Sequence, residues 1–206
     1  MNTGKLVAGP FECVGTGAVR FSRDSKKLAV KSGVHGRCIE VWDVQEQKLD
    51  GRVGEDSCGT WPDSPVFWTT KDRSIVAAFS FESDSKDPTK IYEFDASTLE
   101  TVGAPFEGHT KEITGLALSF DCALLASTSH DRTIKLWAFE YRHLLASFEV
   151  HDPRFLTLSP NSRQLAYTTF DSSRIHICDI PPDILAKVWP EQATCSVCIL
   201  TAYIHL

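Results

Sequence analysis

Short runs of apolar residues alternate with polar clusters along most of the chain. The runs are rich in Val, Ile, Phe, Thr and Leu, and clusters of Asp, Ser, Gly, Lys or Pro interrupt them roughly every ten residues. Within the runs, apolar residues favour alternate positions, which is the period of a strand with one buried face. No segment has the period of a convincing amphipathic helix. The pattern therefore predicts an all-β protein.

The strand pattern repeats four times. Each copy has two apolar positions seven residues apart across a polar turn, and a later strand in which Ile precedes an aromatic or thiol side chain by three positions. The first parts of the copies are "VRFSRDSKKLAV" (19–30), "VFWTTKDRSIVAA" (66–78), "LALSFDCALLAS" (116–127) and "LTLSPNSRQLAY" (156–167). The later strands are "IEVWD" (39–43), "IYEFD" (91–95), "IKLWA" (134–138) and "IHICD" (175–179). Equivalent positions recur roughly every 40 to 50 residues, which is about the length of a four-stranded propeller blade.

These copies resemble WD repeats. Trp42 and Asp43 form the dipeptide that names the family, and residues 107–139, "EGHTKEITGLALSFDCALLASTSHDRTIKLWAF", are nearly a consensus copy. The resemblance implies β-propeller blades of four antiparallel strands each. With about four copies, we expect a partial or unusually small propeller.

Two of the copies depart from the pattern. In the second copy, Phe94 stands where tryptophan is usual, and an insertion at residues 82–88 is expected to form a hairpin loop. In the fourth copy, Cys178 replaces the tryptophan and His151 lacks the preceding glycine. These departures put the internal hydrogen bonds of both blades in question.

The expected organisation is a propeller region, residues 1–185, followed by a non-repeat apolar tail, residues 186–206. Residues 5–13, "KLVAGPFEC", resemble residues 101–109, "TVGAPFEGH", which connect one blade to the next. Residues 5–12 are therefore expected to be an outer strand without a blade of its own. The expected blades span approximately residues 13–54, 64–107, 108–150 and 151–180.

Four blades lie at the bottom of the propeller range, whereas WD repeats usually close as seven or eight. An open arc would expose two apolar blade faces. Three arrangements remain: the chain is the terminal part of a larger array, it pairs with another chain, or it forms a small ring. We favour the first, with further WD blades associating in cis or in trans.

The resemblance also implies a buried chain of hydrogen bonds in the third copy. The Gly-His pair of the family falls at Gly108 and His109, its serine at Ser127, its aspartate at Asp131 and its tryptophan at Trp137. A buried indole N–H needs an acceptor, and a buried imidazole needs partners for both nitrogens. The expected chain runs from the tryptophan through the serine and the histidine to the aspartate.

The same residues allow a rival reading, a hydrolase triad of Ser127, His109 and Asp131. A nucleophilic serine is normally exposed on a sharp turn, often within G-x-S-x-G, but Ser127 lies inside the strand "LLASTS" and the motif is absent. We therefore predict no enzymatic activity and no catalytic residues.

Composition is ordinary for a soluble globular protein. The 206 residues are 42% hydrophobic and 23% charged, with a net charge of -6. Basic residues are scattered, so neither nucleic acid nor an anionic membrane is an expected partner. The chain shows no signal peptide and no apolar run of roughly 20 residues, which favours a cytoplasmic location. The dispersed cysteines are expected to be reduced thiols; they are Cys13, Cys38, Cys58, Cys122 and Cys178.

Other candidate sites are weak. Cys195 and Cys198 form a C-x-x-C, but a structural zinc site needs four ligands and His205 is the only further candidate nearby. The "GTG" at residues 15–17 precedes a predicted strand rather than a helix, which fails the condition for dinucleotide binding. We expect no metal and no cofactor.

The expected function is a non-catalytic scaffold that binds protein partners, because the resemblance implies it. The loops at the Gly-His end of the third copy provide the candidate binding face, made of Thr110, Lys111, Glu112 and His130. Residues 4–12, "GKLVAGPFE", further resemble the C-terminal WD arrays of large multidomain signalling proteins that carry a nucleotide-binding oligomerisation module. Nucleotide hydrolysis is not predicted for this chain. The alternative is a vestigial fragment without independent function.

Overall fold

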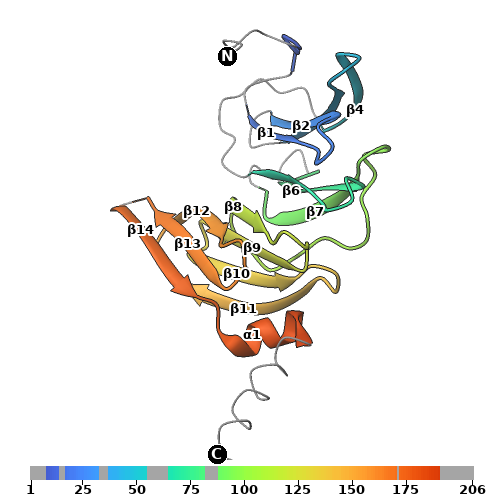
Figure 1. Ribbon diagram of the computed structural model, residues 1–206. Coiled ribbons are helices and arrows are strands. Elements are labelled where there is room, and N and C mark those ends of the chain that lie inside the picture. Colours follow the sequence, from blue (N-terminus) through green and yellow to red (C-terminus); the bar gives the residue numbers. More distant parts are fainter. Residues whose placement is uncertain are drawn as a thin grey trace, which may run out of the picture.

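Four antiparallel sheets follow one another in chain order, from the blue to the orange part of the ribbon in Figure 1. The computed structural model describes residues 8–13, 17–32, 37–54, 65–81, 88–170 and 172–190. The sheets, here called blades 1 to 4, have three or four strands each. The all-β prediction is therefore confirmed.

Blades 1 and 3 have four strands, and the described parts of blades 2 and 4 have three. Blade 1 comprises β1 (Ala18–Phe21), β2 (Lys27–Ser32), β3 (Cys38–Asp43) and β4 (Lys48–Gly54). Blade 2 comprises β5 (Val66–Trp68), β6 (Ser74–Phe79) and β7 (Lys90–Asp95). Blade 3 comprises β8 (Ile113–Leu118), β9 (Leu124–Ser129), β10 (Thr133–Ala138) and β11 (His143–Glu149). Blade 4 comprises β12 (Pro153–Leu158), β13 (Gln164–Thr169) and β14 (Ser172–Asp179).

In blade 2, a connecting segment occupies the outer position in place of a regular strand. Ile91 forms an isolated bridge with Phe106, and Phe94 forms another with Thr101. Val102 N–H also donates to Glu93 O at 2.7 Å. Residues 101–106 thus run beside β7 before the chain enters blade 3.

Three apolar cores lie between successive blades, and the central strands contribute to two of them. In β6, Ile75 and Ala77 face the core shared with blade 1, whereas Val76 and Ala78 face the core shared with blade 3. Because side chains alternate across a strand, a strand covered on both faces must be apolar at nearly every position. The run "SIVAAF" is accordingly buried throughout.

A short helix, α1 (Pro182–Val188), follows blade 4, in a segment where we found no convincing helical period in the sequence. Pro182 opens the helix, where a missing N–H costs nothing, and Asp183 lies in its positively polarised first turn. Ile184 is buried in the core between blades 3 and 4. Two turns are too short to show a helical period in the sequence, and packing supplies most of the stability of such a helix.

The segment before blade 1 packs on that blade without forming a strand over residues 8–13. Phe11 meets Trp42 edge to face at 5.5 Å between ring centroids, just as Phe106 meets Trp137 at 5.9 Å. Gly9 has a φ of 90°, and Pro10 has no N–H to donate, so this segment is poorly suited to strand pairing. The sequence similarity between residues 5–13 and 101–109 thus corresponds to a shared ring contact.

Several sequence expectations lie outside the described residues. They are the start of the outer strand (5–7), Gly15, Cys58, insertion residues 82–87, and Cys195, Cys198 and His205 within the tail. Of the expected tail, residues 186–190 are described and include the end of α1. Within the described part, no helix has the length and apolar character required to cross a bilayer.

Candidate functional site

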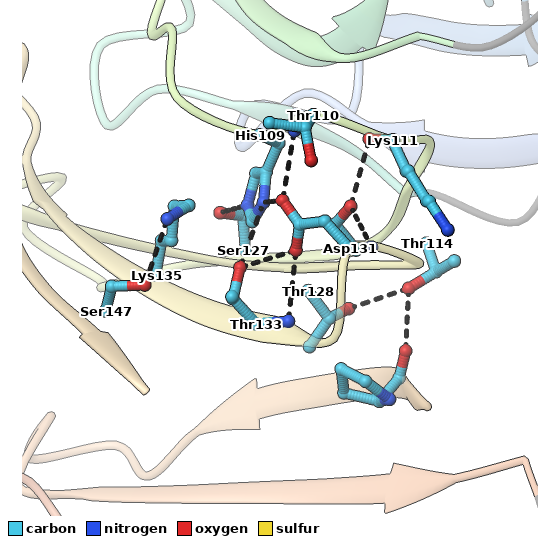
Figure 2. A network of polar contacts seen from close by, with 12 residues as sticks. His109, Thr110, Lys111, Thr114, Ser127, Thr128, Asp131, Thr133, Lys135 and Ser147 are labelled. Carbon is cyan, nitrogen blue, oxygen red and sulfur yellow. Dashed lines mark hydrogen bonds and ion pairs between the residues drawn. The ribbon is translucent and has the colours of Figure 1, made fainter. Parts of the chain in front are cut away.

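Four polar side chains of blade 3 and its entry loop form one continuous chain of hydrogen bonds. Trp137 Nε1 donates to Ser127 Oγ at 2.9 Å, and the same oxygen lies 2.7 Å from His109 Nε2. On the other side of the ring, His109 Nδ1 lies 2.8 Å from Asp131 Oδ2 (Figure 2). Residues from a loop, two strands and a turn are thereby joined.

The chemistry of the groups assigns a direction to this chain. An indole N–H can only donate, and an ionised carboxylate can only accept. Neutral His109 therefore carries its proton on Nδ1, facing Asp131, and accepts the Ser127 hydroxyl proton at Nε2. Ser127 Oγ in turn accepts the Trp137 N–H. Each of these polar groups is satisfied in this arrangement, which is what buried groups require.

We call the end of the blades that contains Gly108 and His109 the Gly-His end. Asp131 holds the loops at this end together through hydrogen bonds. Its carboxylate accepts the backbone N–H of Thr110 at 3.0 Å, the backbone N–H of Thr133 at 3.0 Å and the Thr133 hydroxyl at 2.5 Å. Burial would raise the pKa of Asp131, but the hydrogen bonds from Thr133, His109 and Thr110 outweigh it and lower that pKa.

Burial also governs the protonation of His109. Removing the imidazole from water lowers its pKa, and the hydrogen bond and charge of Asp131 oppose this effect without overcoming it. Protonation would also make Nε2 a donor, leaving the Ser127 hydroxyl proton without its present acceptor. The neutral ring is thus the form that fits the hydrogen-bond chain.

We expect the free energy of unfolding to fall as the pH decreases below about 6.5, the ordinary histidine pKa. Because the folded pKa of His109 is depressed, the unfolded chain binds a proton that the folded chain does not bind. The stabilisation is complete above about pH 6.5 and is lost progressively toward the folded pKa. Urea unfolding at pH 7.5, 6.5 and 5.5 measures this dependence.

His109→Gln should flatten this pH dependence in addition to lowering stability. The matched control is His130→Gln, since His130 is exposed and lies outside the hydrogen-bond chain. An unchanged slope in His109→Gln would mean that other groups cause the acid sensitivity.

The rival triad does not have the geometry of an acyl-transfer site. Ser127 has no exposed surface, and its oxygen already binds both the indole and the imidazole. A substrate carbonyl has no path to this oxygen while Trp137 occupies its accepting side. The arrangement therefore supports a structural role for Ser127, His109 and Asp131.

Blade 1 carries a different network although it contains the Trp-Asp dipeptide. By strand register, Val30 takes the place that Ser127 has in blade 3, so it offers no acceptor. Trp42 Nε1 instead donates to the fully buried Glu40 carboxylate at 3.2 Å, which Arg52 neutralises through contacts of 2.6 and 2.9 Å. We did not predict Glu40 from the sequence. The sequence feature that could have indicated it is an acidic residue two positions before the tryptophan, and therefore on the same face of the strand.

Blades 2 and 4 satisfy their groups in other ways. In blade 2, the Ser74 hydroxyl donates to Glu93, whose other oxygen binds Arg142 from blade 3 at 2.5 Å. In blade 4, Cys178 Sγ lies 3.6 Å from Leu165 O. Among the described sheets, only blade 3 combines the serine, histidine and tryptophan in one chain.

Two threonines join blade 3 to blade 4 in a seam that the sequence did not indicate. Thr114 Oγ1 donates to Pro153 O at 2.9 Å, and Thr128 Oγ1 donates to Arg154 O at 2.7 Å. Figure 2 shows Thr114 between Thr128 and the proline carbonyl. Gly115 follows Thr114 and pairs with Thr128, and its missing side chain lets the β12 backbone approach, because an added Cβ would lie 2.4 Å from Arg154 O.

The candidate binding face is brought together at the Gly-His end. Thr110, Lys111 and His130 are exposed, and Glu112 is half-buried. Glu112 O accepts His130 N–H at 2.9 Å, and Lys111 O accepts the Ser129 hydroxyl at 2.9 Å. The entry loop and the β9–β10 turn are therefore tied together as one surface.

No group of three or more metal-ligating side chains occurs in the described part of the chain. The described cysteines form no disulfide; Cys38 is buried as a small apolar group, and Cys122 is half-buried. Burial raises the pKa of Cys122, which keeps its thiol protonated at neutral pH.

Comparison with known proteins places this blade in a family. Residues 100–138, which include all four residues of the hydrogen-bond chain, match the family described as "WD domain, G-beta repeat". The chain is also 24% identical over 188 residues to the anaphase-promoting complex subunit cdc20 of Dictyostelium discoideum. That alignment covers 89% of this chain but only 33% of the relative, so the chain spans about a third of the relative's length. The third blade thus matches the WD-repeat family model, and the four successive antiparallel blades and the cdc20 similarity support a likeness of the chain to WD-repeat proteins.

Proposed function

We propose that this chain is a non-catalytic scaffold that binds protein partners through the Gly-His end of its blades. The main observation in support of this proposal is the hydrogen-bond chain of blade 3. This chain ends at Asp131, which also holds Thr110 beside the β9–β10 turn. A rigid surface loses little conformational entropy when it binds a partner. Loops held on a rigid scaffold are common sites of recognition.

The name of the relative supports a role within a multiprotein assembly, because that protein is a subunit of a complex. It does not identify the partner of this chain. The four residues of the candidate face, Thr110, Lys111, Glu112 and His130, offer donors, acceptors and charge at one end of blade 3.

We further propose that the two outward faces of the array pack against further WD blades, in cis or in trans. On blade 1, Val19 is more than half exposed, and on blade 4, Ile175 and Ile177 are about two thirds exposed. Large exposed apolar patches usually mark an interaction surface. Together with the short span relative to cdc20, these faces favour a part of a larger propeller.

One experiment tests both proposals. The immobilised chain is incubated with cell lysate, bound proteins are cross-linked and quantified by mass spectrometry, and the cross-linked peptides are mapped. We expect Lys111→Glu/His130→Glu to lose partners that cross-link near the Gly-His end. Ile175→Asp/Ile177→Asp should lose partners that cross-link to β14 and should keep the others.

Circular dichroism must show that both double variants remain folded, which their exposed positions favour. Equal recovery of all proteins by the Lys111→Glu/His130→Glu variant would contradict the proposed binding face. Recovery of no protein by the native chain would favour a vestigial fragment.

A further inference from the structure

A recess lies at the end of the blades opposite to the Gly-His end. It is formed where the first hairpins of blades 1, 2 and 3 meet, and its volume is about 200 Å³. Within blade 3, β8 runs from the Gly-His loop at Ile113 to Leu118, which lines the recess. The strand thus separates this surface from the candidate face described above. We call it the hairpin recess.

The lining of the hairpin recess includes two pairs in which a guanidinium group lies over an aromatic ring. The Arg20 guanidinium lies 5.0 Å from the ring centroid of Phe67, and the Arg23 guanidinium lies 4.7 Å from that of Phe120. Arg23 therefore reaches from blade 1 to blade 3. Phe120 is 72% exposed, so its side chain is accessible to a ligand beside Arg23.

Neither guanidinium forms an ion pair or a side-chain hydrogen bond within the described chain. The acidic group that lines the recess, Asp72, accepts the backbone N–H groups of Arg23 at 2.8 Å and Asp24 at 3.2 Å. This carboxylate therefore holds the blade 1 turn in place. The planar donor groups of both arginines remain available for a carboxylate, which they match in geometry.

The local charge differs in sign from that of the whole chain. The three hairpins, residues 20–27, 67–73 and 118–124, contain six Lys or Arg and three Asp, whereas the complete chain has a net charge of -6. A short acidic segment is attracted to such a patch, while a long polyanion would extend over acidic surface. This contrast favours a compact acidic ligand over nucleic acid.

The size of the recess sets a second limit on the ligand. Sites for small molecules and cofactors usually measure about 300–1,000 Å³. The hairpin recess is smaller and accommodates one or two side chains between Phe21, Phe67 and Phe120. An apolar side chain flanked by carboxylates fits both the rings and the guanidinium groups.

We propose that the hairpin recess binds a short acidic peptide segment that inserts an aromatic or aliphatic side chain between the three phenylalanines. Arg20 and Arg23 bind carboxylates on either side of that side chain. This proposal rests on the proposed scaffold function, to which it adds a second surface and the chemistry of its ligand.

Fluorescence anisotropy with a labelled peptide, Gly-Ser-Glu-Glu-Phe-Glu-Glu-Ser-Gly, tests the proposal. We expect saturable binding that weakens as salt increases from 50 to 200 mM. Replacing all Glu by Gln, or Phe by Ala, should weaken binding about tenfold or more. The variants Arg20→Gln/Arg23→Gln and Phe120→Ser should show losses of similar size.

Arg132→Gln is the matched control, since Arg132 is exposed at the Gly-His end and its loss should leave peptide binding unchanged. Three results would overturn the proposal. The Gln peptide could bind as tightly as the Glu peptide, a ten-residue oligodeoxythymidine could bind more tightly than the Glu peptide, or the Glu peptide could fail to bind at a millimolar concentration of the chain. The lysate experiment distinguishes a wrong assignment of the hairpin recess from a wrong proposal of the scaffold function. Partners that depend on Lys111 and His130 would persist if only the hairpin recess were wrongly assigned.

Discussion

Ser127→Ala is expected to lower the free energy of unfolding by roughly 2 to 4 kcal/mol. The change removes one oxygen that serves two buried groups, the Trp137 N–H and His109 Nε2. A buried polar group left without its partner costs about 1–3 kcal/mol, and the space left by one lost oxygen is too small to admit a well-bonded water in this packed core. Urea unfolding at pH 7.5, followed by circular dichroism, measures the loss.

Ser97→Ala is the matched control for this prediction. Ser97 lies exposed in the turn after β7, so the same chemical change should alter stability by less than about 0.5 kcal/mol. In a Trp137→Phe background, Ser127→Ala should cost less, because the indole donor is already absent. Equal losses for Ser127→Ala and Ser97→Ala would show that the hydrogen-bond chain contributes little to stability.

Gly115→Ala is expected to destabilise the chain by roughly 2 to 4 kcal/mol at the seam between blades 3 and 4. An added Cβ would lie 2.4 Å from Arg154 O and 2.6 Å from Thr128 Oγ1. The first of these is backbone and cannot rotate away, so β12 must shift. Overpacking costs typically 1–3 kcal/mol, and the Thr128 bond to Arg154 O would be lost as well.

Hydrogen exchange read by mass spectrometry, combined with urea unfolding, measures this effect. Protection should fall most in β8 and β12, and blade 1 should change little. Gly51→Ala is the control, because its Cβ would meet only the Leu99 side chain at 3.2 Å, which can move. Uniform loss of protection over all blades would indicate one cooperative unit instead of a weakened seam.

The identity of the third blade was accessible from the sequence because the repeat marks it. Copies of similar length align Ile134 and Trp137 with Ile39 and Trp42, and the resemblance to WD repeats then implies that Ser127 lies on the second strand and Asp131 in the following turn. In the structure, these residues are within hydrogen-bond distance of their expected neighbours. Residue type and strand period are local properties, so a repeat reveals them without three-dimensional information.

The hydrogen-bond partners of the buried polar groups in the other blades could not be predicted from the sequence in this way. Glu40 accepts the Trp42 N–H in a blade where Val30, at the position equivalent to Ser127, offers no acceptor, and Arg52 neutralises Glu40 from the next strand. Which of several polar residues reaches a buried donor depends on pairing between strands. A pattern along one strand does not contain that information.

By itself, the sequence determined the all-β class and the four repeats, since periodicity and residue type specify them, and its resemblance to WD repeats implied the residues of the blade 3 hydrogen-bond chain. The tertiary structure alone decided the helix α1, the threonine seam with Gly115, the Glu40–Arg52 pair and the hairpin recess. Each of these depends on residues from different blades or strands meeting in space. Arg23 and Phe120 are far apart in the chain, and only the packing of three successive blades brings the guanidinium over the ring.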